Sequence, residues 1–452
     1  MKFRNVIFVI LMATELVFAA RIRPAKFPIG FWPTGMPELN EQMVETWADA
    51  GFTLTYVHQN SPDKIKRVLD WAQKNGIQII VDDSRSIAYD AGRKPLELEL
   101  YKKQLISVIA DYSNHPALFG IKIADEPSPT HNLASMVGKA TKIFTELTPD
   151  IQPIINHHPW YPVSPYYHYK NFDEFTEDVH SVIIKNGAEI ISYDCYAQLD
   201  YGSPQEGINL FFDSLYNYSN YAKKHNCDFW TIILATPHIL YDVPSEDSIR
   251  WQFNCALAYG AKGIFYYTFY TPLCENFRCG PIDNTGRKTE KFDWLRRTHR
   301  RFQTLYGDLF LHLELLSVQQ VGRVSGSTKA FEPDECVSAV YAGKGIGFFD
   351  IKQDPNHPFI ISRFRDKNGS DFILIVNNSK TVPVHCVTRF AKKDSKIIRF
   401  EYGATAYKYK NTVRAKLKEA AGGIETDCWL ASGQEVLYLI EDSNSLEKHQ
   451  HE

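Results

Sequence analysis

Eight short apolar runs alternate with amphipathic stretches over residues 26 to 315, and this alternation limits the possible folds more than any other feature. Short apolar runs between polar turns predict strands, and the amphipathic stretches predict helices. Eight strand and helix units in one continuous stretch favour a single (β/α)8 TIM barrel of the α/β class. The predicted strands are residues 27–32, 52–58, 77–83, 118–126, 151–157, 190–194, 229–235 and 263–269.

An open, doubly wound sheet is the alternative to the barrel. No glycine-rich phosphate loop follows any early strand, which counts against this alternative as a nucleotide-binding protein. End signals support the helices. Ser61 precedes Pro62 at a predicted first turn, Glu246 follows Ser245, and Gly51 and Gly76 each stand where a helix would end. The predicted helices are residues 38–50, 61–75, 97–113, 134–147, 209–225 and 245–259.

The pattern changes after the amphipathic stretch 291–316. Short strand-like runs separated by turns follow, and Asp366-Lys367-Asn368-Gly369 is a strong hairpin signal. We therefore predict a barrel domain at 24–316, an all-β sandwich-like domain at 317–442 and a disordered tail at 443–452. The predicted strands of the second domain are residues 337–341, 359–363, 371–376, 382–387, 396–402, 412–417 and 435–440.

The N-terminus has the features of a secretory signal peptide. Lys2 and Arg4 precede an apolar stretch, and small residues follow it near Ala19. We predict a signal peptide at 1–19 and a secreted or periplasmic protein, with an uncleaved anchor as the alternative. No later segment is long and apolar enough to span a membrane. Eight cysteines in 452 residues are not a disulfide framework, and only Cys274 and Cys279 suggest a local bridge.

The strongest functional signal is IKIADEPS at residues 121–128, where an apolar run ends in two adjacent acids and a proline. In a parallel barrel, functional side chains gather at the carboxyl ends of the strands, so Asp125 and Glu126 are candidates for chemistry. The alternative is a helix N-terminus, where acids and proline are also favoured.

Acids and aromatic residues follow the other predicted strands as well. Carboxylates with interleaved rings suit the cleavage of a glycosidic bond, in which one acid protonates the leaving oxygen and a second carboxylate acts as nucleophile or base. A formal net charge of −3 argues against nucleic acid as a partner. The acids and aromatic rings predict a carbohydrate substrate instead. The predicted substrate-binding residues are Asp125, Trp32, Asp83, His157, Trp160, Tyr196 and Tyr267.

Several of these segments resemble a known family. NHPALFG at 114–120 with ADEPS at 124–128 is similar to the fourth-strand region of barrel glycoside hydrolases in the clan that contains β-galactosidases, cellulases and mannanases. ISYDCY at 191–196 and AYGAKG at 258–263 resemble the sixth strand and the approach to the eighth strand of bacterial proteins of this type. The resemblance covers most of the barrel. It implies that Glu126 is the general acid/base.

The sequence departs from that family at two positions. Asp125 stands where the family usually has asparagine, and the family's nucleophilic glutamate at the end of strand seven has no counterpart in ILATPH at 233–238. Asp194 is the predicted second carboxylate, because it ends a strand two places from Glu126. Its alternative is a structural aspartate. Asp83 and Glu275 rank below it, since Asp83 can pair within its own loop and Glu275 can be a solvated loop acid.

The adjacent acids allow a different mechanism. If Asp125 and Glu126 act as a pair, a substrate-assisted route through a sugar acetamido group is possible. We predict no metal or other cofactor, because consecutive strand residues such as His157 and His158 point to opposite faces and cannot share an ion. The predicted function is glycoside hydrolysis. A catalytically inactive carbohydrate-binding barrel is the main alternative, and an adhesion or scaffold protein is a third class.

Overall fold

The computed structural model describes residues 21–89, 97–127, 131–160, 169–199, 202, 204–343, 354–403 and 409–441. The predicted signal peptide at 1–19 and the predicted tail at 443–452 lie outside these residues. Within the described ranges, no helix has both the length and the apolar character to cross a bilayer.

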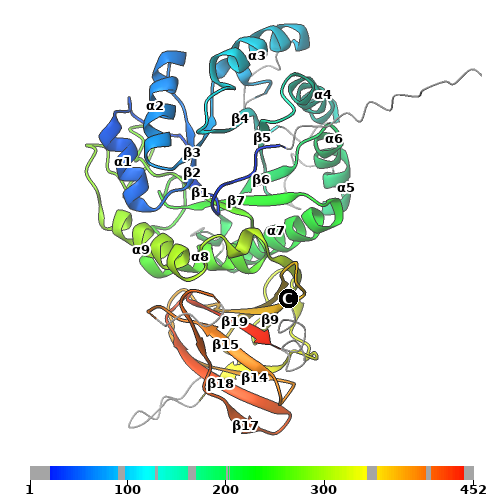
Figure 1. Ribbon diagram of the computed structural model, residues 1–452. Helices are drawn as coiled ribbons and strands as arrows, with labels where there is room; N and C mark the ends of the chain where they lie inside the picture. The colour runs from blue at the N-terminus through cyan, green and yellow to red at the C-terminus, as the bar shows by residue number, and fades with distance from the viewer. Residues whose placement is uncertain are drawn as a thin grey trace, which may run out of the picture.

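Eight parallel strands form the N-terminal domain, as the alternation predicted (Figure 1). Their order around the sheet is β1-β8-β7-β6-β5-β4-β3-β2, which leaves the consecutive strands β1 and β2 to meet at the seam. The Thr53 N–H donates to the Ile29 carbonyl at 2.9 Å there, so the barrel nearly closes. A Cβ atom on Gly30 would lie 2.0 Å from the Leu54 carbonyl oxygen, so only glycine fits at the seam. The strands are β1 (Ile29–Phe31), β2 (Leu54–Val57), β3 (Gln78–Val81), β4 (Leu118–Asp125), β5 (Gln152–His157), β6 (Ile190–Asp194), β7 (Asp228–Leu234) and β8 (Gly263–Tyr267).

Helices surround the barrel on its outer face (Figure 1). The predicted end signals are observed: the Ser61 side chain accepts from the Lys64 N–H, Ser245 forms a capping box with Ser248, and Gly51 ends a helix at a φ of 84°. The helices are α1 (Glu41–Ala50), α2 (Pro62–Lys74), α3 (Leu98–Tyr112), α4 (His131–Leu147), α5 (Phe172–Asp178), α6 (His180–Lys185), α7 (Pro204–His225), α8 (Glu246–Ala258) and α9 (Glu290–Leu305), with short 3-10 turns η1 (Ser84–Ser86), η2 (Ala197–Leu199) and η3 (Leu309–Leu311).

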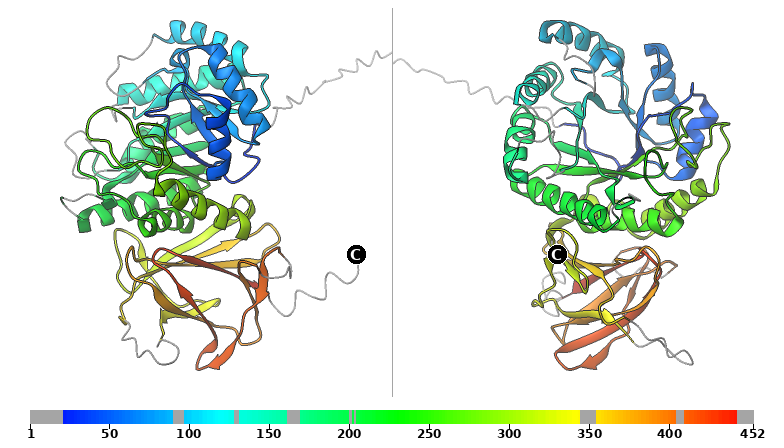
Figure 2. Two further views of the ribbon diagram at one scale, coloured as in Figure 1. Left: turned by 90° about the vertical axis from the view of Figure 1, so that its left-hand side faces the viewer. Right: turned by 180° about the vertical axis from the view of Figure 1, so that it is seen from behind.

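Two sheets, antiparallel except for the short pair β9 and β10, form the C-terminal domain, which confirms the predicted sandwich (Figure 2). One core lies between the sheets, and it includes Val337, Ile375 and Tyr438. Asp366 to Gly369 makes the predicted turn between β12 and β13. One sheet has the order β10-β9-β12-β13-β19-β15-β16 and the other β11-β14-β18-β17. The strands are β9 (Glu314–Val321), β10 (Lys329–Ala330), β11 (Val337–Ala342), β12 (Phe359–Arg365), β13 (Asp371–Asn377), β14 (Val384–Phe390), β15 (Lys396–Phe400), β16 (Thr412–Arg414), β17 (Lys418–Ala420), β18 (Gly423–Leu430) and β19 (Glu435–Glu441).

The seven-stranded sheet packs against α8 and α9 of the barrel (Figures 1 and 2). Its buried Glu435 accepts hydrogen bonds from Asn254 in α8, at 2.6 Å, and from Arg301 in α9, at 3.1 Å. The Ser362 hydroxyl donates to the Ala258 carbonyl at 2.7 Å. The two domains therefore share a tight, partly polar interface.

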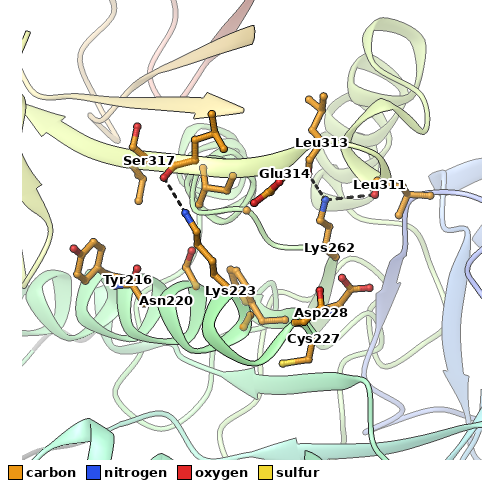
Figure 3. Close-up of a pocket in the computed structure, with 18 of the residues that line it drawn as sticks. Tyr216, Asn220, Lys223, Cys227, Asp228, Lys262, Leu311, Leu313, Glu314 and Ser317 are labelled. Atoms are coloured by element: carbon orange, nitrogen blue, oxygen red, sulfur yellow. Dashed lines mark hydrogen bonds between the residues drawn. The ribbon is translucent and has the colours of Figure 1, made fainter. Parts of the chain in front are cut away.

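A crevice of about 760 Å³ lies where the first strand of the sandwich meets the amino ends of β6 and β7 (Figure 3). Lys262 spans it and donates to the carbonyl oxygens of Phe310 and Leu313, at 2.7 and 2.5 Å. Burial lowers the pKa of Lys262 to about 8. This end of a TIM barrel serves stability, so the crevice belongs to the linkage between the domains.

Alternate residues of each barrel strand face the barrel interior or the helices. In β5, Ile154 belongs to the interior cluster with Trp230 and Phe265, whereas Ile155 packs toward the helices. A register shift between Lys122 and Ala124 interrupts the alternation in β4. This bulge affects the strand that carries the acid pair.

Candidate active site

A cavity of about 520 Å³ opens at the carboxyl ends of the barrel strands. It brings together six residues predicted from the sequence. The residues predicted from the sequence that line the cavity are Trp32, Asp125, Tyr196, Tyr267 and the acid/base candidate Glu126, together with the predicted second carboxylate Asp194.

The two predicted catalytic carboxyl groups line the same cavity close to each other. Burial raises the pKa of Asp194 well above its usual range, and the negative charge of Glu126 raises it further. Asp194 is 9% exposed and the Glu126 side chain 32% exposed. Asp194 is therefore the buried member of the pair, and Glu126 is the accessible member.

Asn156 connects this pair to Asp125. Its amide donates to Asp194 Oδ1 at 3.0 Å and to Asp125 Oδ1 at 3.4 Å, while its own oxygen accepts from the Ser192 hydroxyl at 3.1 Å. Because Asn156 lies on β5, between the strands that carry Asp125 and Asp194, it fixes the spacing of the acids across three strands.

Lys122 balances the negative charge on the other side of Asp125. Its ammonium lies 3.6 Å from Asp125 Oδ2 and 3.4 Å from Asp82 Oδ2, and it stands 4.5 Å from the centre of a Trp32 ring. The Lys122 side chain is only 6% exposed. Asp125 is thus an ion-paired acid that also contacts Asn156, and Trp32 is held against the lysine.

Glu126 adopts an unusual backbone conformation. Its φ is 43°, in the left-handed region that non-glycine residues rarely occupy. Its N–H donates to the Asn156 carbonyl at 2.9 Å, and its carboxylate lies 3.6 Å from His158 Nδ1. Strained residues of this kind gather at active sites and ligand contacts, where the surrounding structure holds them.

Aromatic rings line the cavity on the side of β6, β7 and β8. Tyr196 and Tyr267 stack at 5.5 Å between ring centres, and His238 and Phe277 stack at 4.9 Å. Tyr241 lies 5.6 Å from Tyr196. This wall presents ring faces and hydroxyl groups, the surface on which sugars stack.

Three predicted site residues lie elsewhere. The Asp83 carboxylate pairs with Arg85 at 2.7 Å and accepts from the Tyr112 hydroxyl at 2.8 Å. His157 is 1% exposed and packs against His180, at 4.3 Å between ring centres. Trp160 packs in a separate cluster with Phe175. None of these three residues lines this cavity.

Strand alternation explains why Asp83 and His157 point away from the cavity. Ile80 and Ile154 face the barrel interior, so Asp82 and Asn156 follow them inward, and Asp83 and His157 point toward the helices. Burial lowers the pKa of His157 to about 3, which leaves this ring neutral. His158, one residue later, reaches the cavity instead.

Other lining residues were not among the predicted site residues. Asn156 and His158 lie at the end of β5, and the others lie in the loops after β7 and β8, whose length hides their orientation in the sequence. Cys274 and Cys279 in the second of these loops are free thiols, so the suggested bridge is not formed. Glu275, which ranked below Asp194 as a second carboxylate, also lines the cavity. The unpredicted lining residues include Asn156, His158, His238, Ile239, Tyr241 and Phe277.

No family model and no curated protein matches the sequence. Among solved structures, the chain is similar to a β-galactosidase from Marinomonas ef1, with 12% identity, a TM-score of 0.46 and coverage of 62% of this chain and 60% of the other. A β-galacturonidase from Eisenbergiella tayi gives 15% identity, a TM-score of 0.44 and coverage of 58% and 48%. A glucosidase from Croceicoccus marinus gives 12% identity, a TM-score of 0.43 and coverage of 94% of this chain and 97% of the other.

The likeness is one of fold. The chain spans about 60% and about half of the first two structures. The strand arrangement itself confirms the predicted barrel followed by a sandwich-like module. Function has to be argued from the cavity itself.

Proposed function

We propose that the protein is a secreted or periplasmic glycoside hydrolase that uses Glu126 as the proton donor to the glycosidic oxygen. The position of Glu126 carries this proposal, because Glu126 is an accessible carboxyl group at the carboxyl end of β4 and lines the cavity beside the buried Asp194. The aromatic wall of Tyr196, Tyr267 and Phe277 provides the surface for the sugar rings.

Each remaining group then has a task. Asp194 places a second carboxyl group beside Glu126, Asn156 sets the distance between the acids, and Asp125 with Lys122 offers a charged pair to sugar hydroxyls. His158 contacts the carboxylate of Glu126 from the solvent side. The proposed substrate is therefore a neutral or polar oligosaccharide or polysaccharide, and no step calls for a metal or a redox cofactor.

The test is turnover by Glu126→Gln on substrates with different leaving groups. Wild type and variant are assayed on a panel of unlabelled oligosaccharides, 4-nitrophenyl glycosides and 2,4-dinitrophenyl glycosides. Loss of a general acid lowers rates by about 10²- to 10⁴-fold where the leaving oxygen needs a proton. The expected loss is large for oligosaccharides and small for the dinitrophenyl glycosides, which leave without protonation. Equal losses on both classes would remove Glu126 from the role of acid.

A carbohydrate-binding barrel without catalysis is the second candidate. The absence of a glutamate from residues 233–238, at the end of β7, favours it. Saturable oligosaccharide binding by calorimetry, without product release from any glycan of the panel, would support this candidate and refute hydrolysis.

A further inference from the structure

Most glycoside hydrolases use two carboxyl groups with the anomeric carbon between them. Retaining enzymes hold these groups about 5 to 5.5 Å apart, and inverting enzymes about 6.5 to 9.5 Å apart. Asp194 is only 9% exposed, and Asn156 holds its carboxyl group at 3.0 Å in the cavity wall beside Glu126. Asp194 therefore belongs on the side of the proton donor, and the position facing the opposite side of the sugar is unassigned.

Glu275 lines the same cavity from a loop that follows a different strand. In the strand order, β8 stands four places from β4, which is half the circumference of an eight-stranded barrel. Glu275 belongs to the loop that follows β8, and both Glu275 and Glu126 line the cavity. Tyr267 lies near both acids: burial raises the pKa of its phenol to about 12, and the charges of Asp194, Glu275 and Glu126 contribute to this increase.

A side-chain clamp holds the segment that carries Glu275. Asn276 accepts from the Ile239 N–H at 2.7 Å and donates to the Ile239 carbonyl at 2.8 Å, so one amide satisfies both backbone groups of a residue in the neighbouring loop. Arg278 adds a bond to the Tyr241 carbonyl at 3.1 Å. The loops after β7 and β8 are thereby joined beside the cavity.

Two residues of these joined loops have strained backbone conformations. Ile239 has a φ of 48° and Glu275, which precedes Asn276, a φ of 49°. A β-branched residue such as Ile239 at positive φ is a marked outlier. With Glu126, three cavity-lining residues share this conformation. Strain at positions that line one cavity indicates that their orientation is selected for function.

We propose that Glu275 is the second carboxylate of the site, acting as the base that activates water on the side of the sugar opposite Glu126. This inference rests on the proposed glycoside hydrolase function. Glu126 gives its proton to the glycosidic oxygen, and the bond from that oxygen to the anomeric carbon breaks with its electron pair leaving on the oxygen. A water oxygen forms the new bond to the anomeric carbon, and Glu275 takes a proton from that water. Solvent then returns both acids to their starting states.

Exposure favours water activation over a covalent intermediate. Glu275 is an exposed residue on an open loop, so water reaches its carboxylate directly. Inversion requires a water between the sugar and this base. The expected product has inverted anomeric configuration.

The experiment compares wild type with Glu275→Gln, Glu275→Ala, Glu126→Gln and the control Glu246→Gln on the glycan and aryl glycoside panel. Glu246 is an acid at the start of α8 that pairs with Arg297 at 2.8 Å and does not line the cavity. We expect Glu275→Gln to lower kcat/KM by about 10²- to 10⁴-fold with an unchanged thermal midpoint, and Glu246→Gln to match wild type. Azide should restore turnover of Glu275→Ala on a dinitrophenyl glycoside and yield a glycosyl azide.

The outcomes separate the two proposals. If Glu126→Gln loses activity while Glu275→Gln stays within about threefold of wild type, Glu275 is not the base and the hydrolase function stands. Retained configuration in the wild-type product, followed by NMR, also overturns the water-activating role. If wild type releases no product from any member of the panel, both proposals fail together.

Discussion

Replacing Asp194 by asparagine should make the protein more stable at neutral pH while it impairs activity. The side chain is 9% exposed and accepts from Asn156, and its pKa is raised by burial and by the charge of Glu126. An asparagine keeps the shape and can keep the contact with Asn156, because its oxygen accepts from that amide. The substitution therefore removes one ionisable group and little else.

The size of the effect follows from the burial of Asp194 and from the nearby charge of Glu126. Two full charges about 4 Å apart repel by about 4 kcal/mol at an effective dielectric constant near 20. Wild type avoids this repulsion by keeping Asp194 protonated, and each pKa unit of elevation costs about 1.4 kcal/mol once the pH exceeds the folded pKa. We expect the variant to gain about 1 to 3 kcal/mol near pH 8.

The gain should depend on pH in a defined direction. The folded pKa of Asp194 is raised, so folded wild type binds more protons than the unfolded chain above the unfolded pKa of about 4. Wild-type stability therefore falls as the pH rises from about 4 toward the folded pKa, and the variant lacks this loss. The stability difference should vanish near pH 4 and grow with pH.

Urea unfolding followed by tryptophan fluorescence, at each pH unit from 4 to 8, measures this difference. The control is Glu246→Gln, which removes an acid outside the cavity. The same preparations give kcat, which should fall because Glu126 loses the ionisable group beside it. Parallel stability curves for wild type and Asp194→Asn, or a variant that is less stable at pH 8, would refute the raised pKa of Asp194.

Two further predictions concern the domain linkage and the histidine pair. Lys262→Met leaves the carbonyls of Phe310 and Leu313 without their hydrogen-bond donor. It should lower the free energy of unfolding by about 1 to 3 kcal/mol and leave kcat unchanged. An unaltered thermal midpoint would contradict the role of this lysine. His158→Ala should lower kcat/KM with little change in the thermal midpoint, because His158 lines the cavity. His157→Ala should lower the thermal midpoint and leave the pH profile of kcat/KM unchanged, because His157 is buried away from the cavity. The reverse pattern would contradict the strand orientation.

Much of the architecture could be predicted because it depends on local patterns. Apolar runs and end signals such as Ser61-Pro62 and Gly51 depend on residues close in sequence, and the structure confirms the barrel and the sandwich. β9 and β18 were not predicted as strands. β9 starts inside a stretch whose amphipathic pattern indicated a helix, and its pairing with β12 comes from far along the chain.

The sequence by itself determined that eight strands would bring their carboxyl ends, and with them Asp125 and Glu126, to one rim. Only the tertiary structure decided which neighbouring side chains face the cavity. The bulge in β4 resets the alternation just before the acid pair, and the loops after β7 and β8 position Ile239 and Glu275 through the Asn276 clamp. These contacts join residues 37 positions apart, and no local pattern records them. The proximity of Glu126 and Asp194 likewise exists only because the barrel brings β4 near β6.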